Sequence, residues 1–135
     1  MKLLELIEKY CDKDGDEYIT HGHYFDIKPA SNEELKVFEI HCRKYGVEDS
    51  IINELLDFYK QSNSLFNYFT CADETIFEWW QDSKELWLGN LDMDTFRYSA
   101  KREKYSIGDA SEFSYGEECE FDTFEEMLEA YLQDK

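Results

Sequence analysis

Apolar residues recur at helical spacing in four segments of the chain, and capping residues mark where two of these segments begin. A stripe of apolar side chains at every third or fourth position is typical of an amphipathic helix packed on a core. In the second segment, Ser31 and Glu34 form a capping-box pattern, and Gly46 is a natural stop. Thr123 and Glu126 repeat the capping pattern in the last segment. The four predicted helices cover residues 2–11, 31–46, 49–61 and 123–132.

Other parts of the chain follow a shorter period, in runs rich in aromatic and β-branched residues. Short runs of this kind, separated by turn residues, are typical of antiparallel strands. A run at residues 18–27, followed by Pro29, predicts a hairpin or an extended edge. The segment 73–83 is compatible with a strand or with a helical turn. The remaining strands are predicted at residues 66–70, 85–91, 94–100, 104–109 and 112–116.

The order of these elements predicts one α+β domain over residues 1–135, with helices packed against a largely antiparallel sheet and a C-terminal helix. The chain has one proline and six glycines, and 42% of its residues are hydrophobic, which suffices for one core. Residues 31–133 are expected to form the main body of the fold. Residues 1–30 form a helix and an extended segment, which either belong to the core of that body or pack on its outside.

Acidic residues strongly outnumber basic ones: 32 Asp and Glu against 14 Lys and Arg give a formal net charge of −18. Such a chain is repelled by the phosphates of nucleic acids and by anionic membranes, so neither is an expected partner. A basic protein surface is its electrostatic complement, and association with one would be fast and sensitive to salt. The other interpretation is that the acidic excess only keeps the domain soluble.

Cysteine placement and the N-terminal sequence both indicate a soluble, cytoplasmic protein. The cysteines are scattered without a Cys-x-x-Cys spacing, which favours reduced thiols over a disulfide framework. Glu5, Glu8 and Lys9 interrupt the apolar run that a secretory leader would need. No apolar stretch of the sequence reaches membrane-spanning length. The cysteines are Cys11, Cys42, Cys71 and Cys119.

Residues 12–23 resemble an EF-hand calcium loop, with acids at its first, third and fifth positions. Glu17 stands where such a loop needs glycine and His23 where it needs a closing glutamate, so we expect an acidic turn between a helix and a strand. His21 and His23 would share one face of a strand, as a pair of zinc ligands would. Ordinary histidines on a half-exposed strand are the simpler interpretation, and no metal or other cofactor is predicted. Further zinc ligands would have to be brought close by folding: Cys11, His41 or Cys42.

Two other residue pairs have the form of catalytic motifs. Asp92 and Asp94 form an Asp-x-Asp pattern of the kind that holds a divalent metal in nucleotide-sugar enzymes, but no Gly-rich phosphate loop accompanies them. A solvated strand face explains them better. His41 and Cys42 are adjacent in a predicted helix, where neighbouring side chains diverge by about 100° and cannot form a nucleophile–base pair. We therefore predict no catalytic residue and no enzyme activity.

The adjacent tryptophans of the segment 73–83 are the main candidates for a contact with a partner. At least one of them is expected in the core. An exposed tryptophan beside acidic residues would be a good anchor, since aromatic residues dominate the energetics of protein interfaces. The predicted partner-binding residues are Trp79, Trp80, Asp82, Asp92 and Asp94.

The helix pair at residues 30–66 and the ending at residues 85–132 share their order of elements with a known family. That order is a helix, a short turn, a second helix ending at an Asn-containing turn, a strand meander, and a Phe-Asp-x-Phe-like entry to a final helix. In this chain the short turn is at Gly46 and the Asn-containing turn is at Asn63-Ser64. The entry to the final helix is Phe121-Asp122-Thr123-Phe124. In these features the chain resembles the SUKH superfamily, which includes yeast cell-wall-synthesis regulators of the Knr type and many bacterial immunity proteins.

The resemblance implies a binding module without an active site, and it carries over no catalytic residue. The chain has the departures of a divergent member. Where the family usually has Leu-Pro at the start of the second helix, this chain has Glu48-Asp49-Ser50, and where the family usually has glycine after that helix, it has Ser64. Bacterial members look like immunity proteins that neutralise toxins, many of them nucleases, and a nuclease must carry a basic surface to hold its substrate. The predicted function is therefore that of an acidic immunity protein that binds a cognate toxin. The alternative is an intracellular regulatory or scaffold module of the Knr type.

Overall fold

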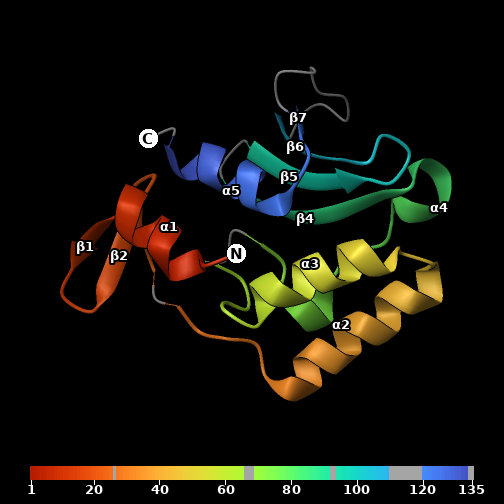
Figure 1. The fold of residues 1–135 in the computed structure, drawn as a ribbon, viewed down its shortest axis with the longest axis horizontal. Helices are drawn as coiled ribbons and strands as arrows, with labels where there is room; N and C mark the ends of the chain where they lie inside the picture. Colours follow the sequence, from red (N-terminus) through yellow and green to blue (C-terminus); the bar gives the residue numbers. More distant parts are fainter. Residues whose placement is uncertain (26, 66–68, 92–93, 110–119, 134–135) are drawn as a thin grey trace.

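Helices cover one face of a four-stranded antiparallel sheet in the computed structural model, which describes residues 1–25, 27–65, 69–91, 94–109 and 120–133 (Figure 1). A smaller, three-stranded antiparallel sheet projects at one end of the molecule. This arrangement confirms the predicted α+β class. The helices of the described residues are α1 (Leu3–Tyr10), α2 (Asn32–Tyr45), α3 (Asp49–Tyr59), α4 (Trp80–Ser83) and α5 (Phe124–Gln133), with a 3-10 turn, η1, at Ala72–Glu74. The strands are β1 (Asp12–Asp14), β2 (Glu17–Thr20), β3 (His23–Phe25), β4 (Glu85–Leu91), β5 (Asp94–Ser99), β6 (Lys104–Asp109) and β7 (Glu120–Phe121).

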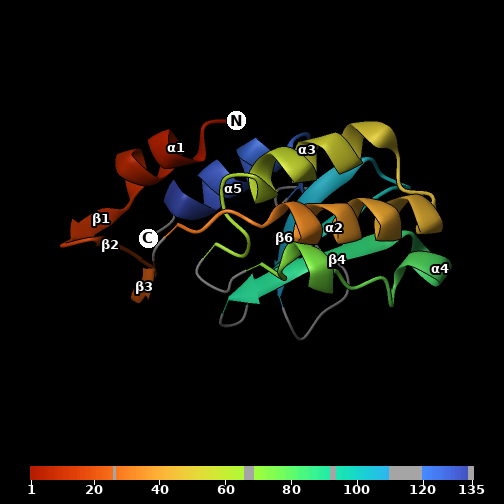
Figure 2. The same ribbon diagram turned by 90° about the horizontal axis from the view of Figure 1, so that it is seen from below.

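The core lies between the large sheet, in the order β4-β5-β6-β7, and the helices α3 and α5 (Figures 1 and 2). Its centre is a cluster of buried aromatic rings from four different parts of the chain. The ring of Phe96 in β5 stacks on that of Phe69, with centroids 4.7 Å apart. The ring of Phe58 in α3 lies 4.7 Å from that of Phe124 in α5. Aromatic contacts of this kind add to the free energy gained by burying the rings.

The helix ends confirm the capping residues that the sequence predicts. Ser31 Oγ accepts a hydrogen bond from the amide of Glu34 at 3.1 Å, and the Glu34 carboxylate accepts one from the amide of Ser31 at 2.9 Å. Gly46 ends α2 with φ of +80°, a conformation that glycine adopts without steric cost. Thr123 Oγ1 accepts from the amide of Glu126 at 3.1 Å, at the start of α5. These local signals therefore set where two helices begin and where one of them ends.

Helix α1 and the inward face of the small sheet belong to the core, which decides for these parts of the first thirty residues an alternative that the sequence left open. Leu3, Ile7 and Phe25 are buried in the same apolar cluster as the residues of α3 and α5. The hydroxyl of Tyr10 donates a hydrogen bond to the Glu129 carboxylate at 3.1 Å, which holds α1 beside α5. The N-terminal helix therefore completes the cover over the helical side of the core.

Two tight hairpins shape the segment that resembles a calcium loop. The prediction of an acidic turn over residues 12–16 was wrong for Asp12–Asp14, which pair with β2 as a strand. The next turn has φ of +49° at His21 and +77° at Gly22, the positive values typical of a two-residue hairpin turn. His21 thus lies in a turn, not on a strand face with His23, and its ring stacks on that of Tyr131 at 4.2 Å.

The predicted strand meander is confirmed where the structure describes it. Strands β4, β5 and β6 occupy the predicted segments, except that β5 ends one residue early, at Ser99. Of the strand predicted at residues 66–70, the structure describes Phe69 and Thr70, and for these two the prediction was wrong: Phe69 forms only an isolated bridge with Gly89. Residues 66–68 and the strand predicted at residues 112–116 lie outside the described residues.

Candidate functional site

The segment between η1 and β4 joins the helical layer to the edge of the large sheet, and carries most of the predicted partner-binding residues. The sequence left its structure open between a strand and a helical turn, and the helical turn forms, with a single isolated bridge before it. Ile76 forms an isolated bridge with Trp87 of β4, and the single turn of α4 follows. Lys84 ends α4 with φ of +57°, and its carbonyl accepts from the amide of Ala100 at 2.9 Å. Contacts with β4 and with the end of β5 therefore fix the segment at both ends.

The two adjacent tryptophans have different environments. Trp80 is 4% exposed, and its indole N–H donates to the carbonyl of Tyr45 at 2.6 Å, which ties α4 to the end of α2. Trp79 is half-buried and stacks on Trp87 with ring centroids 5.2 Å apart. The guanidinium of Arg97 lies 5.3 Å from the Trp87 ring centroid. Because Trp80 is a core residue, Trp79 is the member of the pair that can contact a partner.

Four exposed acids lie near Trp79 along the chain, two of them in η1 and two beside Trp79 at α4. None of the ion pairs found among the described residues involves any of the four. Their charges are therefore not neutralised by a neighbouring cation and remain able to attract one. We call Trp79 and these acids the α4 surface: Asp73, Glu74, Glu78, Trp79 and Asp82.

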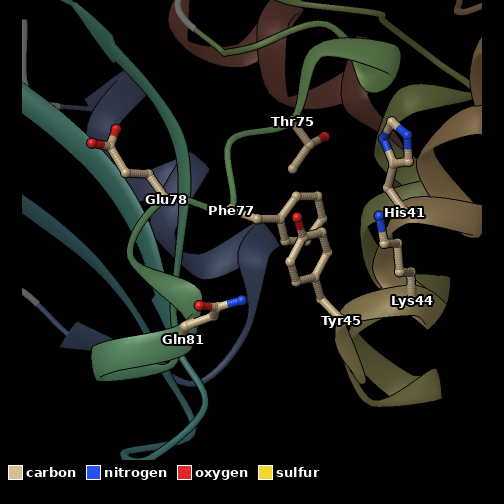
Figure 3. A pocket seen from close by; sticks show the side chains of 7 residues that line it. All are labelled: His41, Lys44, Tyr45, Thr75, Phe77, Glu78 and Gln81. Carbon is tan, nitrogen blue, oxygen red and sulfur yellow. The ribbon is translucent and has the colours of Figure 1, made fainter.

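A pocket of about 400 Å³ adjoins the α4 surface, between α2 and the segment that contains α4 (Figure 3). The rings of Tyr45 and Phe77 stack in its middle with centroids 4.4 Å apart and planes 9° from parallel. His41 and Lys44 line it on the α2 side, and the ring of His41 meets Phe77 edge-on at 6.4 Å. Glu78 and Gln81 line the opposite side. The pocket thus has an aromatic middle between the polar side chains of α2 and those of the segment that contains α4.

The structure separates one predicted partner-binding residue, Asp94, from the α4 surface. Asp94 begins β5 and pairs with Leu91, at the end of β4 that lies farthest from α4. Trp79 stacks on Trp87, four residue steps before Leu91. These four steps span roughly 13 Å, so Asp94 lies beyond the immediate contacts of Trp79. Asp92 lies outside the described residues. Asp82 remains with Trp79, since it lies in the single turn of α4 that follows it.

The residues considered for catalysis or metal binding do not come together in the described part of the chain. Cys42 is buried in the core, which raises the pKa of its thiol to about 12, while His41 lines the pocket. Burial likewise raises the pKa of the Cys71 thiol, helped by the charges of Glu74 and Asp73. Among residues 1–25, 27–65, 69–91, 94–109 and 120–133, no three His, Cys, Asp or Glu side chains form a group that could hold a metal ion.

The stack of Trp79 on Trp87 and the stack of Tyr45 on Phe77 were not predicted from the sequence. The second stack joins residues 32 positions apart, and the first joins residues on either side of the turn that follows α4. Each residue alone is an ordinary aromatic member of its segment. One signal was present: alternation along β4 places Trp87 on the face opposite Leu86 and Leu88. A large aromatic side chain on the face of β4 that points away from the core indicates that another side chain packs on Trp87 there.

Comparisons with known proteins add no relative to this description. No family model, no curated protein and no solved structure matches the chain. Within the described residues, none of the helices has both the length and the apolar character required to cross a membrane.

Proposed function

We propose that this chain is a non-catalytic binding module whose partner is a basic protein, bound through the α4 surface. The observation that carries the proposal is the placement of Trp79, held on Trp87 at 5.2 Å amid exposed acids that form no ion pair in the described structure. A tryptophan held in place by stacking loses little conformational freedom on binding, which favours its use as an anchor.

The chemistry of the surface favours arginine and lysine side chains on the partner. A guanidinium or ammonium group is attracted to the face of an indole ring, and more strongly when water is displaced. Carboxylates of Glu78 and Asp82 can accept charge-assisted hydrogen bonds from the same groups. The chain's formal net charge of −18 would accelerate the encounter with a basic surface and make it sensitive to salt.

We further propose, from the resemblance to the SUKH superfamily, that the chain is an immunity protein and that its partner is a toxin. Among toxins, a nuclease is the best electrostatic complement to this acidic chain, because the surface that binds its nucleic-acid substrate is basic. The chain would then act stoichiometrically, by covering that surface, and need no reactive group of its own. A host regulator as the partner would instead fit the scaffold role of Knr-type relatives.

Capture of the partner tests this proposal. The tagged chain, incubated with an extract of its own cells at low salt and eluted with a salt gradient, should retain a basic protein whose toxic activity it inhibits. Retention of ordinary host regulators would replace the immunity function with the scaffold function. Retention of no basic protein by the wild-type chain, from cells shown to produce the toxin, would contradict both.

Association kinetics then test the surface itself. Replacing two acids of the α4 surface, Glu78→Gln with Asp82→Asn, should slow association and flatten its salt dependence. The matched control is Glu8→Gln with Glu33→Gln, which removes the same charge from exposed positions on α1 and α2. Equal effects of the two double variants would show that only net charge matters and that the α4 surface is not the contact.

A further inference from the structure

The outward face of the small sheet carries an acidic row beside an exposed aromatic residue. Residues directly opposite each other on neighbouring strands share a face, and Asp12, Ile19 and Tyr24 are opposite one another across β1, β2 and β3. Asp14 and Glu17 form the next row of the same face. We call this surface the flap face: Asp12, Asp14, Glu17, Ile19 and Tyr24. The other face of the sheet turns inward, where Tyr18 stacks on Phe25 at 5.5 Å.

The flap face is open and lacks cations of its own. Tyr24 is 58% exposed, among the most exposed large apolar residues of the described structure. The Lys13 side chain lies over the inward ring of Tyr18, at 5.5 Å, and so belongs to the opposite face. None of the ion pairs among the described residues involves Asp12, Asp14 or Glu17.

The arrangement of charges on the flap face is unfavourable for the isolated chain. Asp14 and Glu17 are directly opposite each other across the β1–β2 pair, and like charges in that position destabilise a sheet. Of the acids that resemble a calcium loop, Asp12 and Asp14 lie along the extended strand β1 and Asp16 in the turn that follows, so they are not wrapped around a common point as the ligands of a calcium loop are. A row of carboxylates beside an aromatic ring instead suits an extended basic segment, which would relieve the repulsion.

We propose that the flap face is a second docking surface, and that its occupant is a basic segment of a protein carrying an apolar side chain. Arginine or lysine side chains would pair with Asp12, Asp14 and Glu17, and the apolar side chain would pack on Tyr24 over Ile19. The proposal shares with the proposed function the class of partner, a basic protein, but it uses a different surface. Figures 1 and 2 place the small sheet and α4 at opposite ends of the molecule, so the two surfaces can be occupied together.

A titration followed by nuclear magnetic resonance tests the flap face without the natural partner. The probe is a short capped peptide that alternates arginine with leucine, added to the ¹⁵N-labelled full chain at about 0.15 M salt, where charges beyond about 8 Å are largely screened. The amide resonances of β1, β2 and β3 should move and saturate. A matched peptide with glycine in place of leucine should bind at least several-fold more weakly, because it cannot pack on Tyr24.

Variants at each end of the molecule separate the two surfaces. Tyr24→Ala should weaken binding at the flap face about tenfold, as expected for an aromatic anchor, while Trp79→Ala should leave it unchanged. Tyr24 is exposed, so its loss should leave the fold intact, which unchanged resonances of the core would show. Movement confined to the α4 surface would overturn this inference and leave the proposed function standing.

Three further results would also overturn the proposal. Equal affinity for the leucine and glycine peptides would mean that only charge attracts them. Unchanged affinity after Tyr24→Ala would remove the anchor. Resonances of the flap face that shift with protein concentration, in the absence of peptide, would show that a second copy of the chain occupies this face.

Discussion

Glu54 joins three elements of the core, and its replacement by glutamine should destabilise the fold measurably. The half-buried carboxylate, in α3, accepts a hydrogen bond from the Tyr105 hydroxyl of β6 at 2.6 Å and one from the amide of Phe124, the first residue of α5, at 3.1 Å. Burial raises the pKa of Tyr105, so its phenol keeps its proton and acts as the donor. Glu54→Gln preserves the size of the side chain, removes its charge and leaves one acceptor oxygen where the two bonds use one each.

The magnitude follows from the loss of that charge. Hydrogen bonds to a charged group stabilise by about 1.5–3 kcal/mol and neutral ones by about 1 kcal/mol, a difference of about 0.5–2 kcal/mol per bond. Because the Glu54 carboxylate is only half-buried, the lower half of this range applies, and the two bonds together lose about 1–2 kcal/mol. A negative charge at the N-terminus of a helix contributes about 0.5 kcal/mol more at α5. The expected decrease in the free energy of unfolding is therefore about 2 kcal/mol. For a domain of this size the melting temperature should fall by about 6–10 °C.

Urea unfolding of four proteins measures the effect: the wild type, Glu54→Gln, Tyr105→Phe and the double variant. Because Glu54 and Tyr105 share one hydrogen bond, the two single changes should not be additive, and a coupling free energy of about 1 kcal/mol is expected. A loss below about 0.5 kcal/mol in Glu54→Gln, or additivity within about 0.3 kcal/mol, would refute the role of Glu54 as a charged junction between α3, β6 and α5.

Further predictions concern the adjacent tryptophans, a buried thiol and alkaline stability. Trp80→Ala should lower the free energy of unfolding by about 3–5 kcal/mol, since Trp80 is 4% exposed, and Trp79→Ala by only about 1–2 kcal/mol; thermal denaturation distinguishes them. Cys42, with a pKa of about 12, should resist alkylation at pH 8 in the native chain and react once urea unfolds it; rapid native labelling would contradict its burial. Burial raises the pKa of Tyr98 from its ordinary 10.0 to about 12, so the unfolded chain loses this proton first, and stability should decline as pH rises from 10 towards 12, which urea unfolding at several pH values checks.

The candidate site was predictable only in part. Trp79 and Asp82 were named from the sequence, and the structure places them together at α4. The same residue pattern could not show that Trp80 reaches the carbonyl of Tyr45 from 35 positions away, nor that Asp94 lies at the far end of β4. Both facts depend on how strands and helices pack, and alternation along one segment carries no information about its neighbours.

The sequence by itself determined the local features of this protein. Ser31, Thr123 and Gly46 place helix ends because capping depends on residues within one turn, and the strand meander follows from alternation within each run. The formal net charge of −18 likewise follows from the sequence alone. Only the tertiary structure decided that α1 joins the core, that His21 stacks on Tyr131, and that Asp12 and Asp14 of the calcium-loop pattern lie along a strand. These outcomes depend on contacts between segments that are distant in the sequence. Such contacts form only when the whole chain folds, so the pattern within one segment does not reveal them.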